Sequence, residues 1–352
     1  MKTMNIKNKC FKLAIALIAG CQINSTAVKA QADIHFSQFY ETSILRNPAL
    51  TGVFADDYKF GAYIRNQWSS ISNPYKTELI SAETHIPVSS RRNDFFSIGI
   101  LGYSDIAGSI DQKITAGYLS VGYNKSLSVS HPMFLSVGFA AGYLQYSFDP
   151  SKATFNNQYQ NGHYDAGNPT FENLPNPKMS IYDVGAGVNF NTTSGSNTSY
   201  MIGFSGYHFN QPNYSYYQTT GVSENIRWNA NAGMSMDLSE NLNFLMQANY
   251  AQQGTYNEII TGGLFNWTAL SVGVQKIYVF SAGVFYRVND AYIPVVKITY
   301  MNMSIGLSYD VNISSLTPAS EMKGGYEVTL FYSNNYNNSS GAEKKTVCPR
   351  FF

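Results

Sequence analysis

The sequence is poor in charged residues, which make up 13% of its 352 residues against about 25% in typical soluble domains. Cysteine is also scarce: of Cys10, Cys21 and Cys348, only the last lies beyond the first thirty residues. A single cysteine can form neither an internal disulfide nor a cysteine metal cage. After residue 21 the sequence has no run of the ~20 apolar residues that a membrane-spanning helix requires. These absences argue against a helical membrane protein, a disulfide-built domain and an ordinary cytosolic enzyme.

Catalytic motifs are absent as well. The sequence contains no G-x-x-x-x-G-K-[ST], H-E-x-x-H, G-x-S-x-G or C-x-x-C pattern. Asp56 and Asp57 could bind a cation, but adjacent acids at the entrance of a strand are more often solvated. No nucleophile stands at a catalytic spacing from a base. We therefore expect no enzymatic activity, cofactor or metal, and we interpret the isolated histidines as structural: His35, His85, His131, His163 and His208.

The first thirty residues have the features of an export signal. Four lysines surround or precede a short apolar stretch from Leu13 to Gly20. Cleavage is expected after Ala30 or after Ala32, where small residues precede the bond. The segment ending in Cys21 also resembles a lipobox, in which that cysteine would be acylated, and a short helix that stays attached is a third alternative. We expect ordinary cleavage, with residues 1–30 as the signal peptide.

The signal peptide conceals the charge of the remaining chain. Residues 1–30 contain five lysines and no acidic residue, so the rest has 18 basic and 22 acidic residues and a formal net charge of −4. A mildly acidic chain without a basic cluster is poorly suited to bind phosphate backbones. We therefore expect no nucleic acid among its partners.

From about residue 57 onward, apolar or aromatic side chains alternate with glycine, serine, asparagine and other small or polar ones. In residues 133–143 every odd position is apolar or aromatic, and the even positions from 136 onward are serine, glycine or alanine. Residues 303–311 repeat the pattern. A period of two indicates β-strands.

Alternation by itself fits a soluble sandwich as well as a membrane barrel. The alternating segments often run for about 10 to 13 residues, longer than the ~5 to 6 of soluble strands and suited to a tilted membrane span. Their second face is small and neutral, as a lumen wall would be, and aromatic residues such as Tyr58 and Trp68 gather at segment ends. Together with the export signal, these features predict an all-β fold, a transmembrane antiparallel β-barrel of about 14 strands.

Closure is required because hydrocarbon offers no partners to free backbone groups at a sheet edge. We expect the barrel to span residues 57–333, with residues 148–179 and 210–225 forming long exterior loops. The candidate strands lie near residues 57–68, 76–86, 95–104, 113–126, 133–147, 180–191, 199–209, 226–238, 243–252, 264–274, 277–287, 292–300, 303–313 and 325–333.

Short strings near the two ends of the mature chain carry a family resemblance. They are Gln38-Phe39-Tyr40, Asn47-Pro48-Ala49 followed by Gly52, Arg65-Asn66-Gln67-Trp68, Tyr309-Asp310, Tyr326-Glu327-Val328 and Cys348-Pro349-Arg350. In this order they resemble the PorP/SprF family of outer-membrane proteins associated with the type IX secretion system. Each string is weak alone, but the series covers nearly the whole mature chain and is specific.

The same strings have physical interpretations. Pro48 keeps Asn47 out of the helical region and sets a turn, so residues 31–56 are expected to form a periplasmic or lumenal segment. Arg65 should point into the lumen or lie at the rim, because a lipid-facing charge is costly. Trp68 suits an interface anchor. We expect the motif residues to serve structure or docking and none of them to be catalytic.

Residues 334–352 extend beyond the last expected strand, whereas outer-membrane barrels commonly end on an aromatic residue at that strand's tip. We expect a periplasmic tail. Lys344, Lys345 and the Cys348-Pro349-Arg350 string are available there for docking. The alternative is a disordered tail, which its asparagine, serine and glycine content also fits.

The resemblance implies an accessory component of type IX secretion or gliding motility that supports export or surface attachment of particular cargo proteins, such as adhesins. It further implies periplasmic lipoproteins of the secretion machinery and cargo C-terminal domains as partners, with outer-membrane lipid around the barrel. The alternative is an outer-membrane pore or transporter for small solutes or lipids, which needs an open lumen. A hydrolase would need a nucleophile beside a histidine, and the sequence offers no such pair.

Overall fold

The computed structural model describes residues 33–70, 73–88, 93–128, 132–172, 176–195, 197–216, 221–272 and 275–336. The expected signal peptide with Cys21, and the motif residues Cys348, Pro349 and Arg350, lie outside the described residues. In the described part of the chain, no helix has the length and apolar character needed to cross a membrane.

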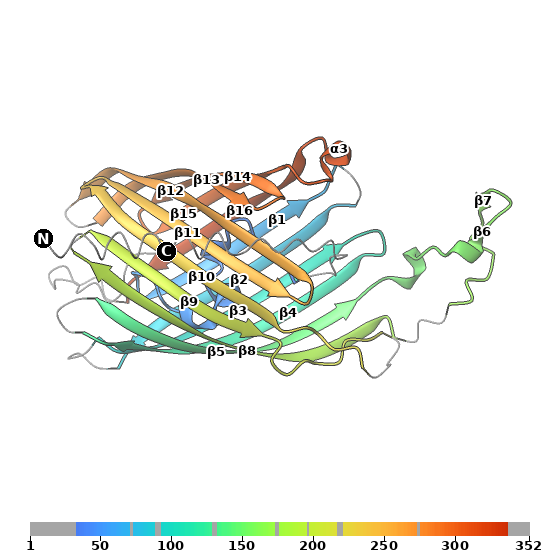
Figure 1. Ribbon diagram of the computed structural model, residues 1–352, viewed down its shortest axis with the longest axis horizontal. Coiled ribbons are helices and arrows are strands. Elements are labelled where there is room, and N and C mark those ends of the chain that lie inside the picture. The colour runs from blue at the N-terminus through green and yellow to red at the C-terminus, as the bar shows by residue number, and fades with distance from the viewer. Residues whose placement is uncertain are drawn as a thin grey trace, which may run out of the picture. The chain divides into compact units, whose positions relative to one another are not determined.

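Fourteen antiparallel strands form a closed barrel (Figure 1). Each strand pairs with its neighbours in the chain, except that β5 pairs with β8 across an insertion and β1 pairs with β16 to close the ring. The predicted barrel of about 14 strands is confirmed. The strands are β1 (Tyr58–Gln67), β2 (Tyr75–Pro87), β3 (Phe95–Ala107), β4 (Gln112–Ser126), β5 (Met133–Ser147), β8 (Lys178–Ser194), β9 (Thr198–Tyr207), β10 (Arg227–Ser239), β11 (Leu242–Gln253), β12 (Tyr256–Val272), β13 (Gln275–Arg287), β14 (Ala291–Tyr300), β15 (Met303–Asn312) and β16 (Lys323–Asn334).

One strand differs clearly from its expected position. The sequence pattern places a strand near residues 264–274, whereas β12 begins at Tyr256. The adjacent Gly262 and Gly263 interrupt the apolar alternation. In the structure these glycines allow close packing, since a Cβ at Gly262 would lie 2.3 Å from the carbonyl oxygen of Val284 on β13.

The two faces of the strands have the composition that the alternation predicts. Burial alternates residue by residue along β5. Val137 and Phe139 are exposed on the outer face, while Ser136 and Ala140 are buried on the inner face. The outer surface is therefore apolar and the lumen wall is built from small and polar side chains.

The connections differ at the two ends of the barrel. The long-loop end carries residues 148–177, with the hairpin of β6 (Tyr159–Gln160) and β7 (His163–Tyr164), and residues 208–226. It also carries α3 (Thr317–Ser320). The short-turn end has joins as brief as residues 240–241 and 301–302. Short turns on one side and long loops on the other are typical of outer-membrane barrels.

Residues 33–56, called the plug below, lie inside the barrel (blue in Figure 1). The backbone N–H of Asp33 donates to Gln253 Oε1 at 3.0 Å, at the long-loop end. At the short-turn end, the N–H of Asp57 donates to the carbonyl oxygen of Asn334. The plug therefore runs along the lumen. It contains three short turns of helix, η1 (Phe39–Glu41), α2 (Ser43–Arg46) and η2 (Pro48–Leu50).

Glycines on the inner face make room for the plug. A Cβ at Gly138 on β5 would lie 2.3 Å from the carbonyl carbon of Pro48 and 2.4 Å from the nitrogen of Ala49. At Gly187 on β8, a Cβ would lie 2.0 Å from Asn47 Oδ1. The small residues of the lumen wall thus match the turn at Asn47-Pro48-Ala49.

We expect Gly138→Ala to displace this turn, because the added methyl group overlaps the plug backbone, and overpacking of this kind typically costs about 1–3 kcal/mol. Hydrogen exchange of the amides at residues 49–53 should become faster. The matched control is Gly117→Ala in the interior of β4, where a Cβ meets no atom within 4 Å. Equal exchange in the two variants would contradict the contact.

Candidate functional site

The turn at Asn47 fixes the middle of the plug to the lumen wall. Asn47 has extended backbone angles, φ −165° and ψ 119°, as the following Pro48 requires. Its Oδ1 accepts from the N–H of Ala49 at 2.9 Å. Its Nδ2 donates to the carbonyl oxygen of Val188 at 3.1 Å and to Asn231 Oδ1 at 3.0 Å. One side chain therefore caps the turn and ties it to β8 and β10.

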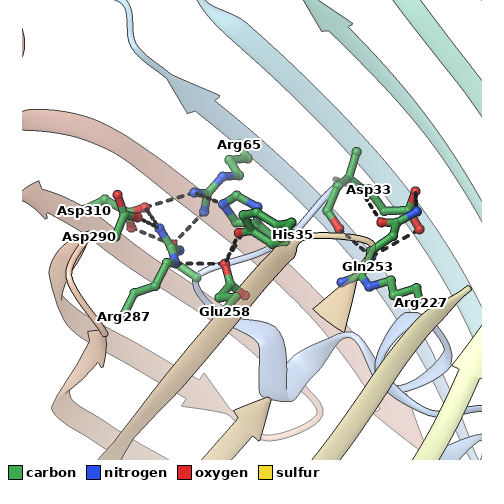
Figure 2. Close-up of polar contacts among 12 residues, drawn as sticks. Asp33, His35, Arg65, Arg227, Gln253, Glu258, Arg287, Asp290 and Asp310 are labelled. Atoms are coloured by element: carbon green, nitrogen blue, oxygen red, sulfur yellow. Dashed lines mark hydrogen bonds and ion pairs between the residues drawn. The ribbon is translucent and has the colours of Figure 1, made fainter. Parts of the chain in front are cut away.

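A buried ionic cluster lies where the barrel closes. Arg65 on β1 and Glu327 on β16 are direct partners in the strand register, and their side chains form an ion pair. Arg65 Nη2 also lies 2.9 Å from Asp310 Oδ2, which Arg287 Nη1 contacts at 3.2 Å. Figure 2 shows Arg65, Arg287 and Asp310 converging from different strands. Arg65, Arg287, Asp310 and Glu327, called the central cluster below, are each at most 3% exposed.

The first residues of the plug complete the central cluster. The backbone N–H groups of Ser37 and Gln38 donate to the two carboxylate oxygens of Glu327, at 2.5 and 2.8 Å. The Ser37 hydroxyl lies 2.5 Å from Asp310 Oδ1 and accepts from both arginines of the cluster, at 2.6 and 2.7 Å. The wall carboxylates thus satisfy backbone donors that would otherwise be buried without partners.

Further charges surround the central cluster. Burial lowers the pKa of His35 to about 4, so the ring is neutral at pH 7 and can accept from Arg65 Nη2, 3.4 Å away. Glu41 on the plug forms an ion pair with Lys297 on β14. Burial would raise the pKa of Glu41, but Lys297 and Lys59 hold it below its ordinary value. Removing one partner of a buried ion pair typically costs about 3–5 kcal/mol, so these contacts lock the plug in the lumen.

A second group of charges, the rim cluster, lies at the long-loop end. His208 Nε2 lies 2.7 Å from Asp33 Oδ2, and its Nδ1 lies 3.0 Å from Asp183 Oδ1. Gln253 Nε2 donates to Glu224 Oε1 at 2.9 Å and to Asp33 Oδ1 at 3.3 Å. Figure 2 shows Asp33 close to the side chains of Gln253 and Arg227. The rim cluster consists of Asp33, Asp183, His208, Glu224, Arg227 and Gln253.

The pKa values in the rim cluster follow from burial and neighbouring charges. Burial alone would lower the pKa of His208, but Asp33 and Asp183 raise it to about 10. Burial alone would raise the pKa of Asp33, but His208 and Arg227 hold it well below its ordinary range. Burial, assisted by the charge of Asp33, raises the pKa of Glu224 to about 7. At neutral pH the cluster therefore holds a protonated histidine between two carboxylates.

The rim cluster has some of the geometry of a metal site. Ligand atoms of Asp33, His208 and Glu224 lie within 4.8 Å of one another. However, both ring nitrogens of His208 face carboxylates, and Arg227 Nη1 lies 3.5 Å from Asp33 Oδ2. Because two cations already lie against Asp33 and Asp183, the arrangement favours a proton over a metal ion.

The motif residues of the plug serve its packing. Gln38 Oε1 accepts from Thr329 Oγ1 on β16 at 3.0 Å. Tyr40 stacks on Phe285 with ring centroids 5.0 Å apart, and Phe39 meets the same ring edge-on at 5.6 Å. These aromatic contacts with β13 lie in an apolar part of the lumen that also contains Leu50.

The motif residues on the strands divide between the two faces of the wall. Arg65 and Asp310 point inward, whereas Tyr309 is 41% exposed on the outer face. Gln67 ends β1 opposite Gly325. Trp68 follows it, half-buried at the long-loop end, with a positive φ of 60°. Thus Gln38, Arg65 and Asp310 meet in one region, while Tyr309 and Trp68 stand apart from it.

Several residues in or beside the two clusters were not predicted from the sequence. Arg287 and Asp183 carry no motif, and neither does Glu258, whose Oε2 lies 3.4 Å from Arg287 Nε. His208 was interpreted as an isolated structural histidine. A usable indication does exist: each of the three strand residues is charged and stands on the small, polar face of an alternating strand. In a chain with only 13% charged residues, charges on a lumen-facing row are candidates for pairing.

The stabilisation that the rim cluster gives to the fold is expected to decrease as the pH rises. Raised pKa values stabilise the fold below the unfolded-state pKa, and that stabilisation is lost as the pH rises through about 7 for Glu224 and about 10 for His208. Hydrogen exchange of residues 208–216, corrected for its intrinsic pH dependence, should accelerate between about pH 4.5 and about pH 7 because of Glu224, and between about pH 6.5 and about pH 10 because of His208. Glu224→Gln should remove the step that ends near pH 7. The control Glu172→Gln, in the other long loop, should keep it; a step that persists in Glu224→Gln would contradict the assignment.

Comparison with solved structures shows that the barrel has the same fold as known transporters and channels. The Ralstonia pickettii toluene transporter TbuX has 9% sequence identity and a TM-score of 0.51, over 84% of this chain and 93% of the transporter. A deltaS2 mutant of the TodX monoaromatic hydrocarbon channel has 8% identity and a TM-score of 0.53, over 84% of this chain and 94% of the channel. At these identities the likeness shows the fold alone, a β-barrel of the outer membrane.

Comparison of the sequence with families is more specific. No curated protein matches the chain. A family model described as "Type IX secretion system membrane protein PorP/SprF" matches residues 28–332, which include the plug and all but the end of the barrel. The resemblance carried by the short motifs is therefore confirmed over most of the sequence. The chain belongs to the PorP/SprF family of type IX secretion system membrane proteins.

Proposed function

We propose that this outer-membrane barrel is an accessory protein of type IX secretion that supports export or surface attachment of specific cargo proteins, such as adhesins. It acts by binding and presentation. Its partners are cargo C-terminal domains at one end and periplasmic lipoproteins of the secretion machinery at the other. The observation that carries the proposal is the family match across residues 28–332, and the filled lumen agrees with a scaffold.

The plug supports a scaffolding role. Residues 33–56 occupy the lumen and are held by the central cluster near one end and by the Asn47 turn in the middle. A lumen filled by a charge-locked segment leaves the loops and turns as the surfaces available to proteins. By the general orientation of such barrels, the long-loop end faces the cell exterior.

The loop at residues 148–177 is the stronger candidate surface for cargo. It projects aromatic side chains into solvent: Phe171 is 82% exposed, Tyr159 61% and Tyr164 47%. Phe171 has a positive φ of 56°, an uncommon conformation for a bulky residue. Exposed tyrosine and phenylalanine are enriched at protein interfaces, where they bury large areas.

Replacing residues 150–176 by a short glycine-serine linker should lower the amount of dependent cargo at the cell surface several-fold, measured by proteomics of the surface and secreted fractions. Serine at Tyr159, Tyr164 and Phe171 should reproduce most of the loss. The matched control places serine at Gln160 and Glu172 in the same loop. Cargo that stays at its normal level in both the linker and the aromatic variants, with the barrel still heat-modifiable on gels, would refute binding through this loop.

A second candidate, an outer-membrane transporter of small apolar compounds or lipids, has one observation in its favour. A groove of about 630 Å³ lies on the outer face of the barrel near the short-turn end. Phe60, Ile98 and Ile100 line it, and Tyr336 contributes a further wall, held by a 2.6 Å hydrogen bond to Thr84 Oγ1. Such a groove could receive an apolar molecule from the membrane.

Planar-bilayer conductance tests whether the lumen is open, as a transporter that moves its substrate through the lumen would require. The full mature protein should show no conductance steps, because the plug fills the lumen. A variant that lacks residues 33–53 should show steps of the size expected for an open barrel, which confirms that the assay detects one. Steps of equal size from the mature protein would favour the transporter.

A further inference from the structure

Arg46 is buried without a counter-charge. It ends α2 in the plug, is 3% exposed, and forms no ion pair with any acidic residue among those the structure describes. Its Nη2 donates to Gln247 Oε1 at 2.9 Å and to the carbonyl oxygen of Ala248 at 3.2 Å. Its Nε and Nη1 are buried and have no acceptor. Its guanidinium carbon lies 5.1 Å from the centroid of the Phe39 ring.

The other two buried arginines of the described chain differ in this respect. Arg65 lies against the carboxylates of Asp310 and Glu327. Arg287 lies within 3.4 Å of carboxylate oxygens of Glu258, Asp290 and Asp310. Among the described residues, the other deeply buried arginines in the lumen are paired with acidic side chains, and Arg46 is not.

This exception is energetically unfavourable. Burial, the only cause acting on it, lowers the pKa of Arg46 to about 9. An unpaired buried charge is strongly destabilising, because it loses its hydration and gains no opposite charge in return. Guanidinium groups are rarely left in this state, and their usual partners are carboxylates and other anions.

The wall beside Arg46 offers neutral amides and no acid. Gln247 on β11 is 0% exposed, and its Nε2 has no acceptor. Asn249 follows on the same inward face of β11, and its Oδ1 is unpartnered. Asn249 pairs in register with Asn231, which binds the Asn47 side chain next to Arg46. The surroundings are therefore polar and uncharged, and the unpartnered groups at Arg46 and Gln247 are donors, whereas that of Asn249 is an acceptor.

We propose that the lumen holds a small monovalent anion, of the size of chloride, beside Arg46, with the free N–H groups of Arg46 and the amide of Gln247 as its donors. The anion neutralises the guanidinium and thereby fixes α2 of the plug to β11. The site is internal and lies apart from the central and rim clusters, whose cations have carboxylate partners. It does not depend on the identity of the cargo.

Thermal unfolding of the detergent-solubilised full-length mature protein tests the site. Chloride replaces isethionate, an anion too bulky for an internal site, at constant ionic strength. Because a ligand that binds only the folded state stabilises it by mass action, chloride should raise the apparent unfolding temperature of the wild type by several degrees. Arg46→Met removes the charge at similar size and should abolish this rise. Lys178→Met removes a charge from an exposed position at the start of β8 and should retain it.

A chloride effect in the wild type and in Lys178→Met, absent in Arg46→Met, supports the site. An equal effect in Arg46→Met, or no effect in the wild type, overturns it. If Arg46→Met does not fold, crystals of the wild type grown in bromide decide the matter. An anomalous bromide peak at Arg46 Nε or Nη1 supports the proposal, and a lumen without such a peak overturns it.

Discussion

The carboxylate of Glu327 takes part in the two contacts on which the barrel and its contents depend. Across the seam between the first and last strands it pairs with Arg65, its direct partner in register. Toward the lumen the same carboxylate accepts hydrogen bonds from the backbone N–H groups of Ser37 and Gln38. Closure of the ring and docking of the plug therefore share one buried group. Since an unpaired buried charge is costly, each event stabilises the other.

The wall composition follows from this arrangement. A barrel of this size needs either a water-filled lumen or a segment that fills it. Here the plug fills it, and the inner face is small where the plug backbone comes close, as at Gly138 and Gly187. The inner face carries a charged residue, Asp310, where the plug offers a hydrogen-bond donor. It carries an aromatic residue, Phe285, where the ring of Tyr40 packs.

The strength of the plug contacts is uneven along its length, and this bears on function. The central cluster is buried and charge-balanced, whereas the rim cluster contains Glu224, whose pKa of about 7 lies within reach of ordinary pH changes. The rim cluster also joins the start of the plug to the loop at residues 208–226, beside the longer loop with its exposed aromatics. A partner that binds these loops would touch the less firmly held end of the plug.

The fold class, the approximate strand positions and the family all follow from the sequence alone. Alternation is a local property, and each strand must place apolar residues toward lipid whatever its neighbours do. The sequence also predicts that the side chain of Arg65 avoids lipid. The partners of Arg65 depend on the folded barrel, because Ser37 lies far from Asp310 and Glu327 in the chain and the three residues come together only when the ring closes. The contact of His208 with Asp33 and the lack of a partner at Arg46 also depend on the folded structure. Both are set by the strand register and by the position of the plug, and neither of these leaves a pattern in the local sequence. In β12 the local pattern itself was misleading. Gly262 and Gly263 interrupt the alternation, so the sequence did not show that the strand begins at Tyr256.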